Sequence, residues 1–270
     1  MPAPSTAAIN GTQLYYEMRG EGEPLVLIHG STLDTRMWDD QFESLATRYR
    51  VIRYDLRGYG KSALPSGTPY SHADDLRALL DFLDAPRAHV LGLSMGGRIA
   101  LHHALTYPAA TTSLILVDSA LDGHPWSSEL RASFDAINRH AEHVGAKAAN
   151  EMWLRHPLFA PARELPNVRA KLDQIVSEHS GWEWLPDECA RGIDPPSIER
   201  LHEIQAPTLI VVGERDLPDF LQIGETLVLG IPNAQCAVMT RVGHMSSMEN
   251  PEEFNAIVLR FLSATASKAK

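Results

Sequence analysis

The feature that most constrains the fold is a serine between two glycines in the segment Gly92–Gly96, which reads Gly-Leu-Ser-Met-Gly. An apolar pair, Val90-Leu91, precedes this segment, and an amphipathic helical pattern over residues 98–105 follows it. A serine in a tight turn between a strand and a helix holds its hydroxyl clear of the sheet, and the glycines let backbone segments approach without a Cβ clash. The pattern therefore predicts a nucleophile elbow with Ser94 as the nucleophile.

An aspartate and a histidine follow Ser94 in the chain, each after a predicted strand. Asp216 comes after the apolar run 208–212, and His244 lies in a predicted loop after the run 235–239. A serine hydroxyl is a poor nucleophile near neutral pH, so it needs a base within hydrogen-bond reach and an acid that orients this base. The order serine, aspartate, histidine is the one that accompanies a nucleophile elbow. We therefore predict that His244 is the general base and Asp216 the orienting acid.

Asp118 is a competing candidate for the orienting acid. It directly follows another apolar run, residues 114–117, and the carboxyl ends of neighbouring parallel strands meet at one edge of a sheet. A carboxylate at this position could therefore also reach His244. We prefer Asp216 and keep Asp118 as the alternative.

Acyl transfer also requires hydrogen-bond donors aimed at the oxyanion that forms during the reaction. These donors are usually the backbone N–H after the nucleophile and one from the loop after an earlier strand. Met95 follows the nucleophile, and the loop with Ser31 and Thr32 follows the apolar strand 25–28. We predict an oxyanion hole from the N–H groups of Ser31 and Met95, with Thr32 as the alternative to Ser31. His29 is expected to have a structural role beneath the site.

Apolar runs alternate with helical patterns over most of the chain, which predicts an α/β fold. Near-continuous apolar strands separated by helices indicate a mostly parallel sheet, here of about eight strands, with helices on both faces. Asn10-Gly11 predicts a hairpin turn between two short strands at the start. The other predicted elements are strands at 25–28, 50–54, 114–117, 208–212 and 235–239, and helices at 38–45, 73–83 and 251–262.

The alternation of apolar strands and helices stops between residues 121 and 202. This segment is rich in aromatic residues, prolines and helical patterns. We interpret this segment as a helical cap inserted into a core formed by residues 1–120 and 203–270. The tryptophans of this segment are expected to form the core of the cap, with one or two of them lining a pocket.

The charge balance excludes several classes of partner. The chain of 270 residues has a net charge of −10, which argues against binding to nucleic acid or to an anionic membrane surface.

The two cysteines of the chain, Cys189 and Cys236, have neither a metal-ligand nor a redox spacing. Without a secretory signal pattern or a run of about 18 apolar residues, the chain is expected to be cytoplasmic, as a monomer or homodimer.

Two motifs that could indicate a cofactor or a metal do not fit. The segment Asp55–Ser62 ends in Gly-Lys-Ser, but an aspartate stands where a phosphate-binding loop needs its first glycine. His140 and His143 have helical ligand spacing, and His202 precedes a glutamate, yet neither set has a partner that would complete a zinc site. We therefore expect no cofactor and no metal.

Together these residues resemble the α/β-hydrolase superfamily over essentially the whole chain. The blocks that carry the resemblance are His29-Gly30 with Trp38 downstream, and residues 55–62, 92–97, 213–216, 243–244 and 249–251. The stretch from His29 to Ser62 looks most like a small capped branch with carboxylesterases, 3-oxoadipate enol-lactonases and cofactor-free haloperoxidases or perhydrolases. The resemblance implies a serine hydrolase that cleaves a small carboxylic ester or lactone through an acyl-enzyme.

Three alternatives remain open. An enol-lactonase for a carboxylate-bearing substrate would favour a cation in the pocket, for which the candidates are Arg57, Arg98, Arg131 and Arg155. Relatives that hydrolyse carbon-carbon bonds usually have a glycine-rich stretch after the His-Gly pair, from which the segment 31–34 departs. A ligand receptor of the same fold would have no need of the predicted histidine and aspartate.

Overall fold

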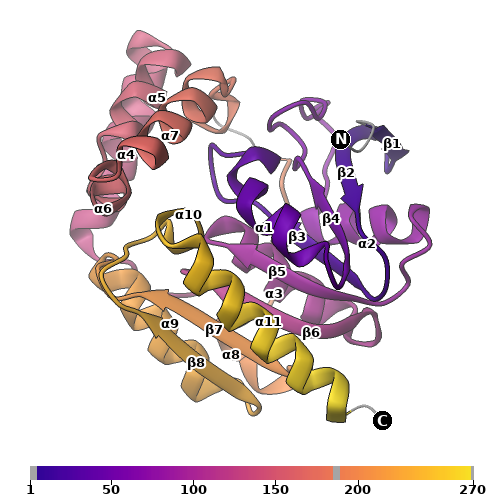
Figure 1. The fold of residues 1–270 in the computed structure, drawn as a ribbon. Coiled ribbons are helices and arrows are strands. Elements are labelled where there is room, and N and C mark those ends of the chain that lie inside the picture. The colour runs from indigo at the N-terminus through magenta and orange to yellow at the C-terminus, as the bar shows by residue number, and fades with distance from the viewer. Residues whose placement is uncertain (1–4, 185–188, 269–270) are drawn as a thin grey trace.

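A computed structural model describes residues 5–184 and 189–268 and contains one open sheet of eight strands, shown in Figure 1. The strands lie in the order β1-β2-β4-β3-β5-β6-β7-β8. Their bounds are β1 Ser5–Ile9, β2 Thr12–Arg19, β3 Pro24–Ile28, β4 Arg50–Tyr54, β5 Ala88–Leu93, β6 Thr111–Val117, β7 Thr208–Gly213 and β8 Ala234–Met239. This architecture confirms the predicted α/β fold.

The direction of the strands follows from their connections. β2 is antiparallel to both of its neighbours, whereas every pair from β4 to β8 is parallel. Asn10 and Gly11 have φ values of 43° and 71°, so they form the tight turn that joins the antiparallel pair β1–β2. The parallel strands β5 and β7 are buried along their whole length, as expected for strands covered on both faces.

Helices cover both faces of the sheet. In Figure 1, α1 and α11 lie in front of the strands and contact each other, while α2, α3 and α9 lie behind them. The bounds are η1 Thr35–Trp38, α1 Asp39–Leu45, α2 His72–Phe82, α3 Met95–Thr106, η2 Pro108–Ala110, α9 Pro218–Gly230, α10 Ser246–Glu249 and α11 Pro251–Lys268. The last helix continues past residue 262, where the prediction ended because the apolar periodicity stops there. The residues that follow include good helix formers, so the helix extends to Lys268.

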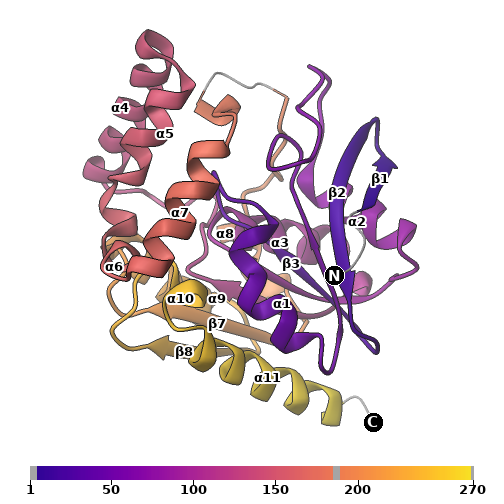
Figure 2. The ribbon, with the colours of Figure 1, turned by 45° about the horizontal axis from the view of Figure 1, so that its top comes forward.

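The helices between β6 and β7 form a separate group beside the sheet, as Figure 2 shows. They are α4 Ser128–Val144, α5 Ala146–Leu154, η3 Pro157–Phe159, α6 Ala160–Arg163, α7 Pro166–Glu178 and η4 Trp182–Trp184. After them the chain returns to the core, where α8 (Ser197–Arg200) contacts α3 and η5 (Leu201–Glu203) contacts α9. We refer to residues 128–184 as the cap helices; the division of the chain at residues 121 and 202 remains a prediction.

Two histidines in the core are held uncharged by burial. His29 and His103 are fully buried, and this burial lowers the pKa of each to about 4. The Nε2 atom of His29 accepts a hydrogen bond from the Leu56 N–H at 3.0 Å, which leaves Nδ1 protonated to donate to the Gly30 carbonyl at 2.8 Å. The neutral ring of His29 thereby ties the end of β3 to the loop after β4, as its expected structural role requires.

These histidines should make the folded protein less stable in mild acid. Below about pH 6.5 the unfolded chain binds protons at positions 29 and 103 that the folded chain does not bind until about pH 4, so the free energy of unfolding falls over this range. The loss is up to about 1.4 kcal/mol per pH unit for each group. Urea unfolding at about pH 7 and pH 5 should show this loss, and His103→Leu should reduce it. An equal loss in this variant would contradict the assignment.

Candidate active site

Ser94 lies in the turn between β5 and α3 with backbone angles that few residues adopt. Its φ is 56° and its ψ is −115°, a conformation that persists only where surrounding contacts hold it. The Ser94 N–H donates to the Val117 carbonyl at 2.9 Å, and its own carbonyl accepts from Ala120 at 3.1 Å. A Cβ on Gly92 would overlap the Gly96 carbonyl, so the glycine is needed for this close approach. Ser94 therefore lies in a strained turn between a strand and a helix, where the elbow is predicted, and its role as nucleophile remains a prediction.

His244 lies in the loop between β8 and α10, and the neighbouring backbone is anchored by Glu249. The Glu249 carboxylate accepts hydrogen bonds from the N–H groups of Gly243, at 2.8 Å, and Met245, at 3.1 Å. The ring of Phe220 packs against the imidazole with 4.3 Å between centroids. His244 is thus buried and held from two sides.

Asp216 and His244 form a buried hydrogen-bonded pair. The Nδ1 atom of His244 lies 2.8 Å from Oδ2 of Asp216, and the Asp216 side chain is fully buried. Because the carboxylate accepts from Nδ1, the remaining nitrogen, Nε2, carries the lone pair that a general base uses. Nε2 has no hydrogen-bond partner among the described residues, and His244 and Ser94 line the same cavity. The three predicted triad residues are therefore brought together, although no hydrogen bond joins Ser94 to His244.

Asp118 has a different set of partners. Its Oδ1 accepts from the Gly213 N–H at 2.7 Å and its Oδ2 from the Ser246 hydroxyl at 2.6 Å. Burial and then the nearby Asp216 carboxylate raise the pKa of Asp118 well above its ordinary value. Asp118 thus links the end of β7 to the helix after His244, and it makes no hydrogen bond to the imidazole, whose Nδ1 pairs with Asp216 instead.

The loop after β3 turns sharply beside Ser94. The Leu33 N–H donates to the Gly30 carbonyl at 3.3 Å, and Thr32 has a φ of 61°, as the third residue of a type II turn does. Ser31 lines the cavity with Ser94, whereas Thr32 is fully buried and its hydroxyl accepts from the Trp153 indole at 2.8 Å. Met95 opens α3, so its N–H has no intrahelical acceptor. This arrangement favours Ser31 over Thr32 as the second donor, and both roles remain predictions.

The cavity at Ser94 is very small and mostly apolar. Its volume is about 10 Å³, enough for no more than about one water molecule. The residues that line it are Gly30, Ser31, Leu33, Leu93, Ser94, Trp153, Leu158, Phe159, His244 and Met245. Three of these, Trp153, Leu158 and Phe159, come from the cap helices, so a substrate can enter only if the cap or these side chains move.

None of the four arginines considered from the sequence is among the residues that line this cavity, although the Arg98 backbone N–H donates to the Ser94 carbonyl at 3.1 Å. Arg57 is buried and paired with Asp75 at 2.9 Å, and Arg98 lies 3.5 Å from Asp122. Arg131 and Arg155 are exposed on the cap helices. The described lining therefore supplies no cation to a substrate carboxylate.

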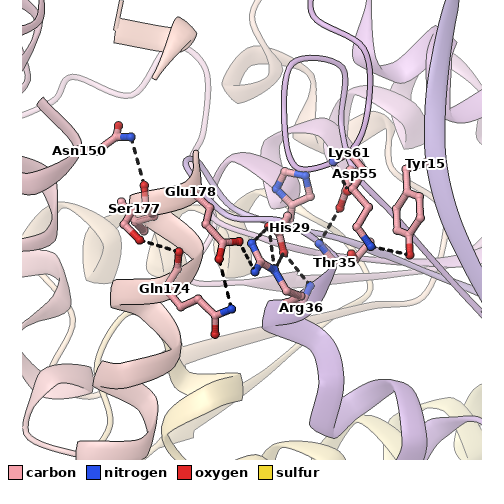
Figure 3. Close-up of polar contacts among 12 residues, drawn as sticks. Tyr15, His29, Thr35, Arg36, Asp55, Lys61, Asn150, Gln174, Ser177 and Glu178 are labelled. Atoms are coloured by element: carbon pink, nitrogen blue, oxygen red, sulfur yellow. Dashed lines mark hydrogen bonds and ion pairs between the residues drawn. The ribbon is translucent and has the colours of Figure 1, made fainter. Parts of the chain in front are cut away.

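A wider cleft of about 290 Å³ lies next to the cavity, and Leu33 lines both of them. Figure 3 shows several charged residues of this cleft, with Arg36 of the core reaching toward Glu178 of α7. Lys61 and Asp55 lie on its far side. Residues of the core and of the end of α7 line this cleft, and Leu33 is the lining residue that it shares with the cavity of Ser94.

Sequence reasoning gave no role to Glu249 or Glu183, and it did not single out Trp153 as the cap tryptophan that lines the cavity. Glu249 belongs to a block that resembles the superfamily, so a signal for it was present. Trp153 could only be placed in the cap in general, because periodicity does not reveal which side of a cap helix faces the cavity. Glu183, between two tryptophans, had no sequence signal, yet its carboxylate accepts a hydrogen bond from Ser31 at 2.8 Å.

The described residues contain neither a metal-binding cluster nor a membrane-spanning helix. No group of three or more histidine, cysteine, aspartate or glutamate side chains within 5–184 and 189–268 is arranged to hold a metal ion. In the same part of the chain, no helix is both long and apolar enough to cross a lipid bilayer.

Comparison with known proteins gives consistent matches over most of the chain. The family described as "Alpha/beta hydrolase family" matches residues 25–257. A 2-hydroxy-6-oxononadienedioate/2-hydroxy-6-oxononatrienedioate hydrolase from Pseudomonas putida is 31% identical, with 93% of this chain and 91% of that protein covered.

Two solved structures are similar in both fold and length. An enol-lactonase from Burkholderia xenovorans LB400 has a TM-score of 0.82 and 28% identity, with 96% of this chain and 100% of that chain covered. A thermophilic esterase from Thermogutta terrifontis has a TM-score of 0.81 and 29% identity, with 98% of this chain and 99% of that chain covered. The proteins similar to this chain thus act on different bonds within one fold.

Proposed function

Because the chain belongs to the alpha/beta hydrolase family and is a hydrolase, we propose that it cleaves a small carboxylic ester or lactone through an acyl-enzyme intermediate. The observation that carries the proposal is the buried pair of His244 and Asp216, with 2.8 Å between Nδ1 and Oδ2. Nε2 of this histidine has no hydrogen-bond partner among the described residues, and His244 lines the same cavity as Ser94. An enol-lactonase and an esterase among the similar structures support the same substrate class.

The proposed reaction proceeds in two steps. Ser94 Oγ attacks the carbonyl carbon while Nε2 of His244 takes the hydroxyl proton, and Asp216 stabilises the imidazolium that results. The oxyanion accepts hydrogen bonds from the N–H groups of Met95 and Ser31. Collapse of this intermediate breaks the ester bond, and His244 returns the proton to the leaving alcohol. Water, deprotonated by His244, then attacks the acyl-enzyme and releases the acid.

Carbon-carbon bond hydrolysis is the second candidate. It is favoured by a specific finding, the 31% identity to a 2-hydroxy-6-oxononadienedioate hydrolase over 93% of this chain. The substrate named for that relative is a dioate, which carries two carboxylates. The cavity lining around Ser94 contains no arginine or lysine that would pair with them, so the ester or lactone reading is preferred.

A panel of 4-nitrophenyl esters from acetate to decanoate tests the proposal. We expect turnover by the wild type to be highest with the short acyl chains, because bulky side chains enclose the cavity above Ser94. The Ser94→Ala variant serves as the blank for turnover that does not depend on the nucleophile. If the folded wild type hydrolyses none of these esters but cleaves a 2-hydroxy-6-oxo-dienoate, the second candidate replaces the first.

A further inference from the structure

Glu183 brings a carboxylate of the cap helices to the edge of the proposed oxyanion hole. Its Oε2 atom accepts a hydrogen bond from the Ser31 hydroxyl at 2.8 Å and another from the Tyr59 hydroxyl. Ser31 lines the cavity of Ser94, and the Tyr59 hydroxyl lies 3.5 Å from the sulfur of Met95. The carboxylate therefore contacts Ser31, one of the two residues proposed to hold the oxyanion. It also contacts Tyr59, which is a neighbour of the second, Met95.

The surroundings of Glu183 fix it in this position. The ring of Tyr59 stacks on His179, with 5.1 Å between centroids, and meets Trp182 edge to face at 5.7 Å. Trp182 packs against Gly58, where a Cβ would overlap the indole. The side chain of Glu183 is consequently only 10% exposed. It is a packed part of the contact between cap and core.

The charge of Glu183 is poorly balanced by its neighbours. Among the described residues, no arginine or lysine lies within ion-pair distance of the carboxylate, and the nearest basic atom is Nε2 of His179 at 3.3 Å. The second oxygen, Oε1, is buried without a hydrogen-bond partner in the described part of the chain. Burial of a carboxylate without full pairing is costly, so its field acts strongly on any group that enters nearby.

We propose that Glu183 determines substrate specificity by excluding substrates that carry a carboxylate and admitting neutral ones. This inference rests on the proposed hydrolysis at Ser94 and names the substrate class of that site. A second negative charge in the same low-dielectric region would be repelled, and the described cavity lining holds no arginine or lysine to offset it. The chain would then differ from its relative that acts on a dioate.

Two esters that differ only in charge test the proposal. They are methyl 4-nitrophenyl adipate, which is neutral, and mono-4-nitrophenyl adipate, which carries a free carboxylate. The wild type should show a kcat/KM for the neutral ester at least about fiftyfold higher, and Glu183→Gln should lower this ratio at least about tenfold. The same oxyanion forms with both esters, so any effect of Glu183 on the oxyanion changes both kcat/KM values equally. The ratio of the two values therefore reports only on the free carboxylate of the substrate.

Control variants separate charge from packing. Glu183→Gln removes the charge but keeps an acceptor for the hydroxyls of Ser31 and Tyr59, whereas Glu183→Leu removes both the charge and the acceptor. If the ratio of the two kcat/KM values falls equally in both variants, the effect is due to charge. Glu178→Gln, which removes an exposed cap carboxylate, should leave the ratio unchanged. Turnover that depends on Ser94 with an unaltered ratio in both Glu183 variants overturns this inference alone. Absence of such turnover with either ester in the wild type overturns the proposed function as well.

Discussion

Replacing Ser94 with alanine is expected to lower kcat for the best nitrophenyl ester by several powers of ten, on the order of 10⁶. The size of the effect follows from the mechanism, since removal of Oγ leaves no atom that can form the acyl-enzyme. His244 and the oxyanion donors would still be present, so a small residual rate above that in water should remain. Steady-state kinetics of the purified variant measures the loss.

The fold should survive this substitution, which makes the kinetic result interpretable. Ser94 holds its turn through its backbone N–H and carbonyl, and alanine retains both groups. Circular dichroism and the urea unfolding midpoint should therefore match those of the wild type. Retention of more than a few per cent of wild-type turnover, in a preparation free of contaminating esterase, would show that Ser94 is not the nucleophile.

The fold was predictable because its signals are local. Each parallel strand contains an apolar run, and β5 and β7 are buried along their whole length. Because the segments between these runs have helical patterns, periodicity alone indicated a sheet covered on both faces. The elbow was predictable because its signal is also local. Other backbone segments approach positions 92 and 96 so closely that only glycine fits there, and both positions lie within a few residues of Ser94. The order of Asp216 and His244 along the chain supplied the rest of the candidate triad.

The parts that sequence reasoning left open depend on contacts between distant segments. Ser31 and Thr32 are adjacent in the chain, and only the turn at Thr32, with its φ of 61°, separates the residue that lines the cavity from the one buried behind it. Glu183 and Ser31 are joined across the cap and the core by a single hydrogen bond. Neither periodicity nor spacing contains this information, because it arises from how the cap helices pack on the sheet.

The acid of the proposed triad can be identified by two isosteric substitutions. Asp216→Asn should lower kcat by about 10⁴, because an amide in place of the carboxylate no longer holds the imidazole in the tautomer that leaves Nε2 free to accept a proton. The variant should remain folded, since asparagine fills the same buried space and can still accept from the Leu217 N–H. Stopped-flow and steady-state assays on one ester would measure the change.

Asp118→Asn is the matched control, and its outcome should differ by orders of magnitude. Asp118 makes no hydrogen bond to His244, and its oxygens accept hydrogen bonds from the Gly213 N–H and the Ser246 hydroxyl. Because its burial beside Asp216 raises its pKa, removal of the charge also relieves a repulsion between two carboxylates. We therefore expect kcat within about tenfold of the wild type. A collapse of kcat in Asp118→Asn together with an active Asp216→Asn would transfer the orienting role to Asp118, since only the acid that faces the imidazole can set its tautomer.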